Sequence, residues 1–232
     1  FRYFNKMNKK KKITNILNNA NSLIDIFKFY KEKYPNKKIL FKKKNDYWKG
    51  YTFQEIFRNV SHLNNFFKDS KIEKGDRVFL LSSNRIEWVE FDLAIMSAGA
   101  ITVPSFVTNN VGDNNFIIKN CKPSFFVIEN LDIYKKNEKI LKRFEKSRII
   151  LIDNLNNNKK FYSYEELVSK ESKKKFVYSL KKNDISTLIY TSGTSSFPKG
   201  VVLTHKSLIH NLYAALDLIG QFGIKNEKFI SF

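Results

Sequence analysis

Short apolar runs alternate with amphipathic segments along most of this 232-residue chain. The runs "KGDRVFLLSS", "AITVPSF", "SFFVIE" and "SRIILID" are too short for helices, and the segments between them repeat their apolar residues at helical spacing. Continuous apolar strands are typical of a parallel sheet that is buried on both faces, because the crossover helices must lie against it. The sequence therefore predicts an α/β fold, with three α/β/α layers around a mainly parallel sheet.

Turn and capping signals place the ends of several elements. A helical pattern that begins near Ser22 stops at Pro35, and two short strands are predicted on either side of Asn45 and Asp46. We expect one continuous helix in "LDIYKKNEKILKRFE", and a last helix with Thr204 as its N-cap. Three pairs have the spacing of a capping box: Thr52 with Glu55, Asn84 with Glu87, and Ser163 with Glu166.

Most other features are interpreted as structural. Residues 154–176 are polar and low in complexity and are interpreted as a surface excursion, whereas "NDISTLIYT" is predicted to be a buried strand. Trp48 and Trp88 are expected in the core or over the sheet. His205 and His210 are expected to be ordinary surface or packing residues.

The chain is strongly basic, with 42 lysines and arginines against 22 acidic residues and a formal net charge of +20. These cations are spread between apolar segments over the whole length. The spread argues against a nucleic-acid-binding protein and fits the codon bias of an AT-rich genome. The densest run, "NKMNKKKKITN" at residues 5–15, lies in what we interpret as a basic leader, residues 1–21. We expect a solvated leader, with peripheral docking on an anionic membrane as the alternative.

Two further features bear on the compartment and on completeness. Cys121 is the only cysteine, so no internal disulfide can form, and it is expected to be a small packing residue. No run of about 18 apolar residues exists, which speaks against a membrane-spanning helix and favours a cytoplasmic protein. The chain starts with Phe rather than Met and ends in an apolar, strand-like segment, so we expect a portion of a longer protein.

The stretch "YTSGTSSFPKG", residues 190–200, follows a predicted strand and is rich in small hydroxylated residues. Such a loop offers unobstructed backbone N–H groups, hydroxyl donors and one cation, which suits phosphate oxygens. The pattern G-x-x-x-x-G-K-[ST] of P-loop NTPases is not met, because Lys199 follows Pro198 and precedes Gly200. From composition alone, an ordinary surface loop is an equally good interpretation.

The longer stretch "LIYTSGTSSFPKGVVLTHKSLIHN", residues 188–211, resembles the phosphate-loop signature of the adenylate-forming, or AMP-binding, superfamily. The segments "YTFQEIFRNVSHLNNFF", "IEKGDRVFLLSSNRIEWVEFDLAIMSAGAITVPSF" and "PSFFVIEN" resemble its N-terminal region in the same order. The wording around residues 82–104 is most similar to bacterial-type long-chain fatty acyl-CoA synthetases. The resemblance implies that residues 22–232 are the N-terminal part of an AMP-binding domain, within the large N-terminal domain of these enzymes.

The resemblance also implies a reaction: ATP-dependent activation of a long-chain fatty acid to an acyl-adenylate and then to acyl-CoA, with Mg²⁺ as cofactor and CoA as co-substrate. Catalytic residues would lie downstream of residue 232, so we expect this portion to be inactive alone. Ser196 stands where the family usually has a glycine, which would weaken the loop without abolishing it. The residues implied in binding the ATP phosphates are Thr191, Ser192, Gly193, Thr194, Ser195, Ser196 and Lys199.

Two alternatives stay open at this point. One is an adenylate-forming ligase that acts on a different carboxylic acid. The other, from a different class, is a basic module that binds nucleic acid or a membrane surface, with binding that collapses as salt rises.

Overall fold

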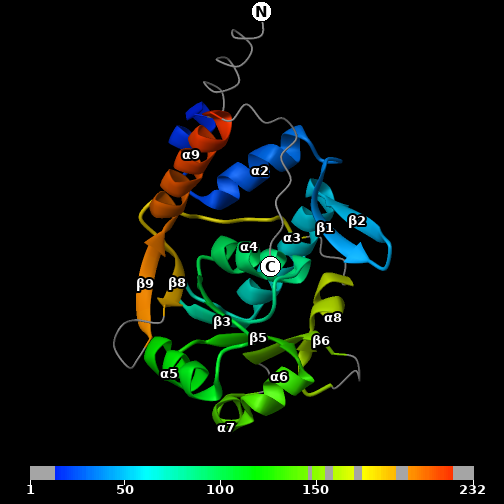
Figure 1. The fold of residues 1–232 in the computed structure, drawn as a ribbon, viewed down its shortest axis with the longest axis vertical. Coiled ribbons are helices and arrows are strands. Elements are labelled where there is room, and N and C mark those ends of the chain that lie inside the picture. Colours follow the sequence, from blue (N-terminus) through cyan, green and yellow to red (C-terminus); the bar gives the residue numbers. More distant parts are fainter. Residues whose placement is uncertain (1–13, 146–147, 155–158, 170–173, 192–197, 222–232) are drawn as a thin grey trace, which may run out of the picture.

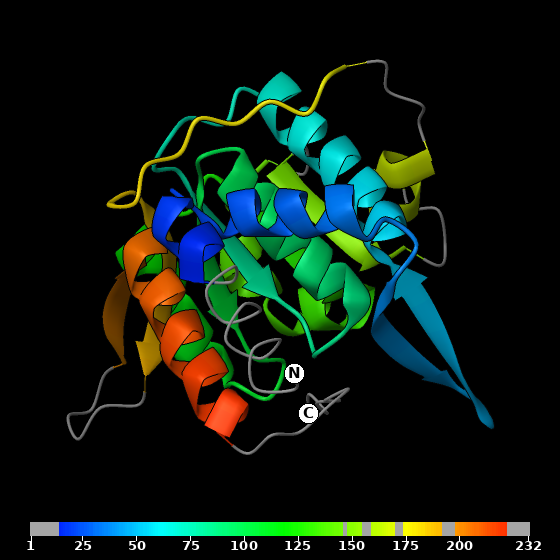
Figure 2. The same ribbon diagram turned by 90° about the horizontal axis from the view of Figure 1, so that it is seen from above.

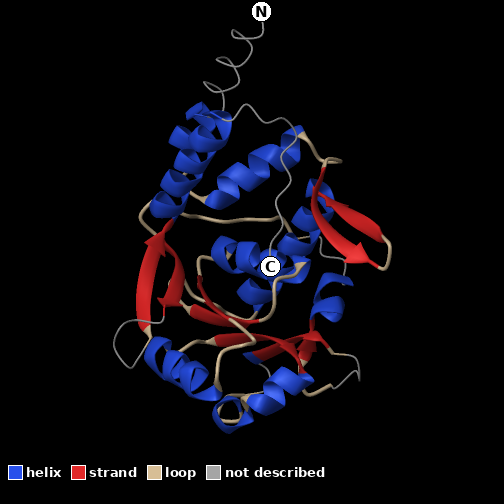
Figure 3. Cartoon of the chain, viewed as in Figure 1, coloured by secondary structure: helices blue, strands red, loops and turns tan. Residues whose placement is uncertain are grey.

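The centre of the molecule is a mainly parallel sheet. The computed structural model describes residues 14–145, 148–154, 159–169, 174–191 and 198–221. Within these residues a seven-stranded sheet has the order β7-β6-β5-β3-β4-β8-β9, and every neighbouring pair is parallel except β8 and β9 (Figure 1, Figure 3). The strands are β3 (Arg77–Leu81), β4 (Ile101–Ser105), β5 (Phe125–Asn130), β6 (Ile149–Asp153), β7 (Tyr162–Ser163), β8 (Ile185–Thr191) and β9 (Lys199–Thr204).

Helices cover both faces of this sheet, as Figure 1 shows. α3, α4 and α8 pack on one face, and α5, α6 and α7 pack on the other. The predicted three-layer α/β/α fold is therefore confirmed. The helices are α2 (Leu23–Lys33), α3 (Phe53–Asp69), α4 (Ile86–Ser97), α5 (Val111–Cys121), α6 (Leu131–Lys136), α7 (Glu138–Leu141), α8 (Tyr164–Ser169) and α9 (His205–Gln221).

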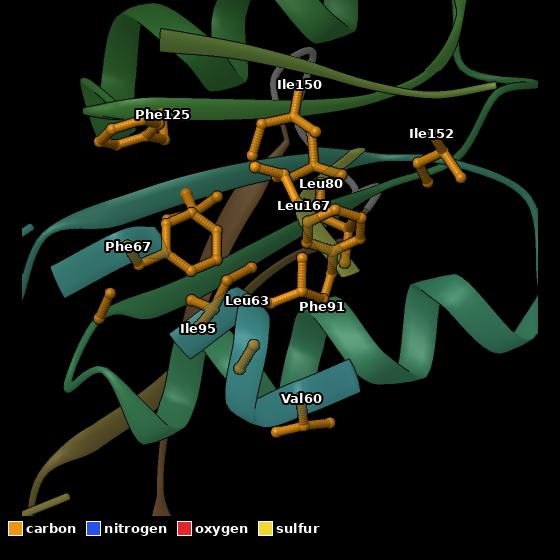
Figure 4. Packing of buried hydrophobic residues seen from close by; sticks show 14 of the residues in the cluster. Val60, Leu63, Phe67, Leu80, Phe91, Ile95, Phe125, Ile150, Ile152 and Leu167 are labelled. Atoms are coloured by element: carbon orange, nitrogen blue, oxygen red, sulfur yellow. The ribbon is translucent and has the colours of Figure 1, made fainter. Parts of the chain in front are cut away.

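Alternate residues of each central strand enter the two cores, because successive side chains of a strand point to opposite faces. In β3, Val78 and Leu80 pack with α3 and α4, whereas Phe79 and Leu81 pack with α5. Figure 4 shows the first core, in which Phe67 of α3 faces the strand residue Phe125. Burial on both faces explains why these strands read as unbroken apolar runs.

Most of the predicted caps and turns are present. The Thr52 and Glu55 pair forms a full capping box at the start of α3, and the Ser163 hydroxyl accepts a hydrogen bond from the Glu166 backbone at 3.2 Å. Asn45 takes a left-handed conformation, with φ of 50°, between the two strands that were predicted around it. These local signals fix the ends of the elements before any tertiary contact is considered.

The cap predicted at Asn84 is wrong. α4 is preceded by Arg85 as N-cap, and the Arg85 side chain makes no capping hydrogen bond. Arg85 instead donates from Nε to Glu87 at 2.8 Å and from both terminal nitrogens to Asp153 at 2.7 and 2.9 Å. The partly buried guanidinium therefore recruits the glutamate that was expected to close the capping box, and it ties α4 to the end of β6.

The predicted helix over residues 131–145 is interrupted at Asn137, which separates α6 from α7. Asn137 is buried, and its side chain donates to the Ile133 carbonyl at 3.0 Å and accepts from Asn114 at 3.0 Å. A polar side chain held in this way competes with the helical backbone and breaks the helix.

Two other structural interpretations need correction. Residues 154–176 are only in part a surface excursion, because Tyr162, Tyr164 and Leu167 from this stretch pack against the core beside α3. Trp48 is exposed on the hairpin, not buried in the core, whereas Trp88 does pack against the core as predicted. Cys121 is buried in the core beside α5 as expected.

A buried carboxyl group joins three of the helices. Glu90 of α4 is completely buried, accepts a hydrogen bond from Asn59 of α3 at 2.9 Å, and also accepts one from the Tyr164 hydroxyl of α8. Burial raises the pKa of Glu90 to about 7, against the hydrogen bonds, which lower it. Nearby Glu87 raises this pKa further, and Arg58 lowers it.

This burial predicts a pH-dependent stability. A glutamate in an unfolded chain ionises near pH 4.3, so between about pH 4 and 7 the unfolded chain releases a proton that the folded protein keeps, and stability falls as pH rises. Glu90→Gln removes that loss. By urea unfolding, we expect Glu90→Gln to match the wild type near pH 4 and to exceed it by roughly 3–4 kcal/mol at pH 8. Glu73→Gln, at an exposed position, controls for net charge. Parallel pH curves for wild type and Glu90→Gln would contradict the prediction.

The remaining elements lie outside the sheet layers. α2 contacts α3, α4 and α9. The strands β1 (Lys38–Lys44) and β2 (Tyr47–Thr52) form a separate antiparallel hairpin. Leu17 and Ala20, in the stretch interpreted as leader, are buried against α2 and α9, and residues 1–13 lie outside the described residues. In the part of the chain that the structure describes, no helix is both long enough and apolar enough to cross a bilayer.

Candidate functional site

The predicted phosphate loop connects β8 to β9. Thr191 at the end of β8 lies opposite Lys199 at the start of β9, and both side chains are exposed. The structure thus brings the two ends of the motif together. The other predicted site residues, Ser192, Gly193, Thr194, Ser195 and Ser196, lie outside the described residues.

The antiparallel course of β9 follows from this connection. Residues 192–198 are too few for the crossover that a parallel pair requires, so the chain returns beside β8 as a hairpin. β8 was predicted to be buried, but only Ser186 and Thr187 are, because the strand lies next to the edge of the sheet. The outer half of β8, residues 188–191, is therefore half-buried or exposed.

Packing on one face holds the base of the hairpin. Tyr190 and Leu188 of β8 pack against the core beside α5, and the Tyr190 hydroxyl donates to the side chain of Asn120. Burial raises the pKa of Tyr190 to about 12, so it stays protonated at neutral pH. Gly200 of β9 lies directly opposite Tyr190, and a Cβ at Gly200 would lie 3.3 Å from the Tyr190 ring. A glycine at this position therefore leaves room for the ring to lie over β9. Since side chains alternate along a strand, Thr191 and Lys199 point to the face opposite Tyr190.

The motif lies at the carboxyl end of the parallel strands, which is where ligands bind in open α/β folds. β8 is parallel to β4. Thr191, the last residue of β8, therefore lies on the same side of the sheet as the carboxyl ends of β3, β4, β5 and β6. The chain leaves β3 through α4 over one face and leaves β4 through α5 over the other face. Such a reversal opens a crevice at the carboxyl ends of the strands.

Sequence reasoning missed two polar clusters at this edge. Ser105, at the end of β4, donates to Asn114 at 2.7 Å and accepts from Asn109 at 3.0 Å. Glu129, at the end of β5, accepts from the Ser83 backbone and hydroxyl, both at 2.6 Å. These bonds fix the loops that follow β3 and β4. The available signal was the set of Ser and Asn residues directly after two apolar runs.

The start of α9 is fixed beside the motif. The Thr204 hydroxyl accepts a hydrogen bond from the Ser207 backbone at 3.2 Å, which confirms the predicted N-cap. His205 is 1% exposed and its backbone N–H donates to the Asp184 carbonyl at 3.1 Å, so it is a packing residue as predicted. Burial lowers the pKa of His205, against the nearby carboxylates of Asp184 and Asp25.

The electrostatics of the described part of the site are cationic. Lys199 forms no ion pair with any residue that the structure describes. Over the same residues, no group of three or more His, Cys, Asp or Glu side chains could hold a metal ion. A hydroxyl and an ammonium group at the mouth of a loop are complementary to an anion such as a phosphate.

Comparison with known proteins gives one family. Residues 27–232 match the family described as "AMP-binding enzyme". Long chain acyl-CoA synthetase 3 of Arabidopsis thaliana is 29% identical over 216 residues, covering 84% of this chain and 32% of that protein. Long-chain-fatty-acid–CoA ligase FadD15 of Mycobacterium tuberculosis is 28% identical over 170 residues, covering 69% of this chain and 27% of that protein. The chain thus spans about a quarter to a third of the length of the curated relatives it matches.

Solved structures agree in fold. A fatty acyl-adenylate ligase from L. pneumophila, in complex with acyl adenylate and pyrophosphate, aligns with a TM-score of 0.68 and 24% identity over 91% of this chain and 35% of that one. The anthranilate CoA ligase AuaEII, in complex with anthranoyl-AMP, aligns with a TM-score of 0.69 and 22% identity over 80% of this chain and 35% of that one. At these identities the similarity establishes the fold alone.

Proposed function

The chain belongs to the AMP-binding enzyme family, and from this premise we propose that it carries the ATP phosphate-binding part of a ligase that activates long-chain fatty acids. The observation that carries the proposal is the pairing of Thr191 with Lys199 at the open end of the β8–β9 hairpin. A family signature and a sheet edge suited to ligands coincide at this one connection.

The phosphate-binding residues follow from the resemblance and from this placement. We assign the β- and γ-phosphates to backbone N–H groups and hydroxyls of the loop, with Lys199 as counter-charge. Thr191 is fixed by its strand, so its hydroxyl is pre-positioned at the start of the loop. The proposed residues are Thr191, Ser192, Gly193, Thr194, Ser195, Ser196 and Lys199.

The proposed reaction has two steps. A fatty carboxylate oxygen attacks the α-phosphorus of ATP, the bond to the bridging oxygen breaks, and pyrophosphate leaves. The thiolate sulfur of CoA then attacks the acyl carbon and AMP leaves with the electron pair. Mg²⁺, when bound with ATP, would neutralise phosphate charge. The residues of this chain would hold the pyrophosphate portion in line and stabilise the negative charge that develops on it.

A long-chain fatty acid is the proposed substrate because the relatives that match most of the chain are named as long-chain acyl-CoA synthetases or long-chain fatty acid CoA ligases. The second candidate is a ligase of the same family that acts on a different carboxylic acid. We propose a cytoplasmic location. The proposed partners are therefore ATP, CoA and a fatty acid.

The choice of acid predicts a chain-length profile. Pyrophosphate release by the complete gene product is measured with ATP, Mg²⁺ and CoA across acids from acetate to oleate. We expect palmitate and oleate to give at least about tenfold higher kcat/KM than acetate, because each buried methylene adds about 0.8 kcal/mol of binding. Release that is no faster with palmitate than with acetate would contradict the long-chain assignment. That result would not contradict the proposed phosphate site, because the protein could still activate another acid, and benzoate and amino acids can be tested as substrates.

A further inference from the structure

The β1–β2 hairpin projects from the body of the molecule, on the side away from β8 and β9 (Figure 1, Figure 2). Its inner half is anchored, since Ile39, Leu40 and Tyr51 pack against the core. Its outer half, residues 41–49, is exposed at every position. The projecting half therefore makes few contacts with the body of the molecule, one of which joins Lys42 to Glu87 of α4 at 3.9 Å.

This outer half carries large aromatic side chains in water. Trp48 is 60% exposed, Tyr47 is 58% exposed and Phe41 is 49% exposed. Three such residues on one short ribbon are unusual for a protein surface without a partner, because each would release free energy on leaving water. Tryptophan and tyrosine are the residues enriched where a protein meets the headgroup region of a bilayer.

Lysines accompany the aromatics on both faces of the hairpin. Residues 38–52 contain five lysines and one acidic residue, Asp46. Lys42 lies directly opposite Lys49, and Lys43 lies opposite Trp48. Like charges placed opposite each other destabilise a strand pair. One weak neighbour stands beside each of these two lysines: the Lys42 ammonium is 3.9 Å from Glu87, and the Lys49 ammonium is 5.0 Å from the centre of the Tyr51 ring. The arrangement is therefore complementary to a dense external anion surface.

We propose that the outer half of the β1–β2 hairpin docks on an anionic phospholipid surface. The hairpin enters tip first, so that lysines of both faces contact the lipid headgroups, while Trp48 and Phe41 on one face and Tyr47 on the other enter the interfacial region. A nucleic acid fits less well, because single strands are bound in a basic groove that follows their backbone, whereas this feature is a projecting ribbon suited to a broad surface. The proposal does not rest on the proposed ligase function.

The first test measures binding to vesicles by co-sedimentation. The protein is mixed with vesicles of phosphatidylcholine alone or with 30% phosphatidylserine, at low and at high salt. We expect binding only to the anionic vesicles. Lys43→Glu/Lys44→Glu should lower the partition coefficient by at least about 30-fold, from the contribution of each lysine near such a surface.

The matched control is Lys135→Glu/Lys136→Glu on α6, which changes net charge by the same amount at exposed positions on the far layer of the sheet (Figure 1). We expect it to lower the partition coefficient less than about threefold. Equal losses for the two double variants would overturn the proposal, because total charge would then explain the binding. Absence of binding to anionic vesicles by the wild type would also overturn it.

The second test uses the fluorescence of Trp48 to measure whether this side chain contacts the lipid. These 232 residues contain two tryptophans, so within them Trp88→Phe leaves Trp48 as the only tryptophan reporter. We expect its emission to shift to shorter wavelength with anionic vesicles, and not with single-stranded nucleic acid of the same charge concentration. Vesicle binding without a Trp48 shift would overturn the proposal by placing the contact elsewhere on the chain. Tighter binding to the nucleic acid than to the vesicles would overturn it in favour of a nucleic-acid surface.

Discussion

Lys199→Ala in the complete gene product is expected to lower kcat/KM for ATP about 100-fold. Loss of one fixed donor to a developing negative charge commonly costs two to three orders of magnitude in rate, and charge-assisted hydrogen bonds are among the strongest in proteins. Lys199 is exposed and forms no ion pair within the described residues, so its removal should break no structural contact there. The measurement is initial-rate kinetics with ATP varied at saturating palmitate and CoA.

Lys206→Ala is the matched control. Lys206 is exposed on α9, seven positions further along the chain, and its backbone N–H bonds to the Lys182 carbonyl without using its side chain. We expect kcat/KM for this variant to stay within about twofold of the wild type. If both variants lose activity equally, net charge explains the effect. If Lys199→Ala keeps its kcat/KM for ATP, the phosphate-binding role assigned to this lysine is wrong.

The layers of the fold could be predicted because their causes are local. A strand buried on both faces must be apolar throughout, and a crossover helix must be amphipathic, so β3 to β6 and their helices were readable in order. The cap at Thr52 depends only on residues three positions apart. The family resemblance, confirmed by the match over residues 27–232, was readable for the same reason, because its motifs are contiguous.

The features that were missed depend on residues far apart in the sequence. Glu87 was expected to cap α4, but its carboxylate accepts a hydrogen bond from Arg85 instead. Arg85 is itself held by a hydrogen bond to Asp153 at the end of β6. Asn137 ends α6 because a buried partner, Asn114, lies 23 positions earlier. Trp48 is exposed because its hairpin leaves the body of the molecule, which neither aromatic content nor strand alternation reveals.

The candidate site also combines features that the sequence predicts with features that only the structure shows. From the sequence, the loop between Thr191 and Lys199 is predicted to bind phosphate through its resemblance to a family signature, and that role stays a prediction. The structure adds that the two ends pair across a hairpin at the edge where β3 to β6 end. It also adds Ser105, Asn109 and Glu129 as the groups that fix the neighbouring loops. The roles of residues 192–196 stay predictions.

Phe67→Ala is expected to lower the free energy of unfolding by about 3–5 kcal/mol, a large part of the stability of an ordinary domain. The Phe67 side chain is completely buried, and its ring centroid lies 5.7 Å from that of Phe125 in an edge-to-face arrangement and 6.5 Å from that of Phe91. It therefore connects α3 to both β5 and α4, and its loss leaves a cavity between layers that cannot close without moving a helix. The measurement is urea unfolding followed by circular dichroism.

Phe106→Ala is the control, since Phe106 is 66% exposed directly after β4, and we expect it to cost no more than about 0.5 kcal/mol. A cost for Phe67→Ala below about 1 kcal/mol would mean that α3 does not pack on the sheet as described. The variant also separates the core from the site. Under conditions where Phe67→Ala is folded, its KM for ATP should match the wild type, because Phe67 packs in the core with Phe91 and Phe125, and none of these residues is proposed to bind ATP. Lys199→Ala should show the reverse, with unchanged urea unfolding and altered kinetics, since a residue at the open end of a hairpin contributes to binding rather than to the packing of the layers.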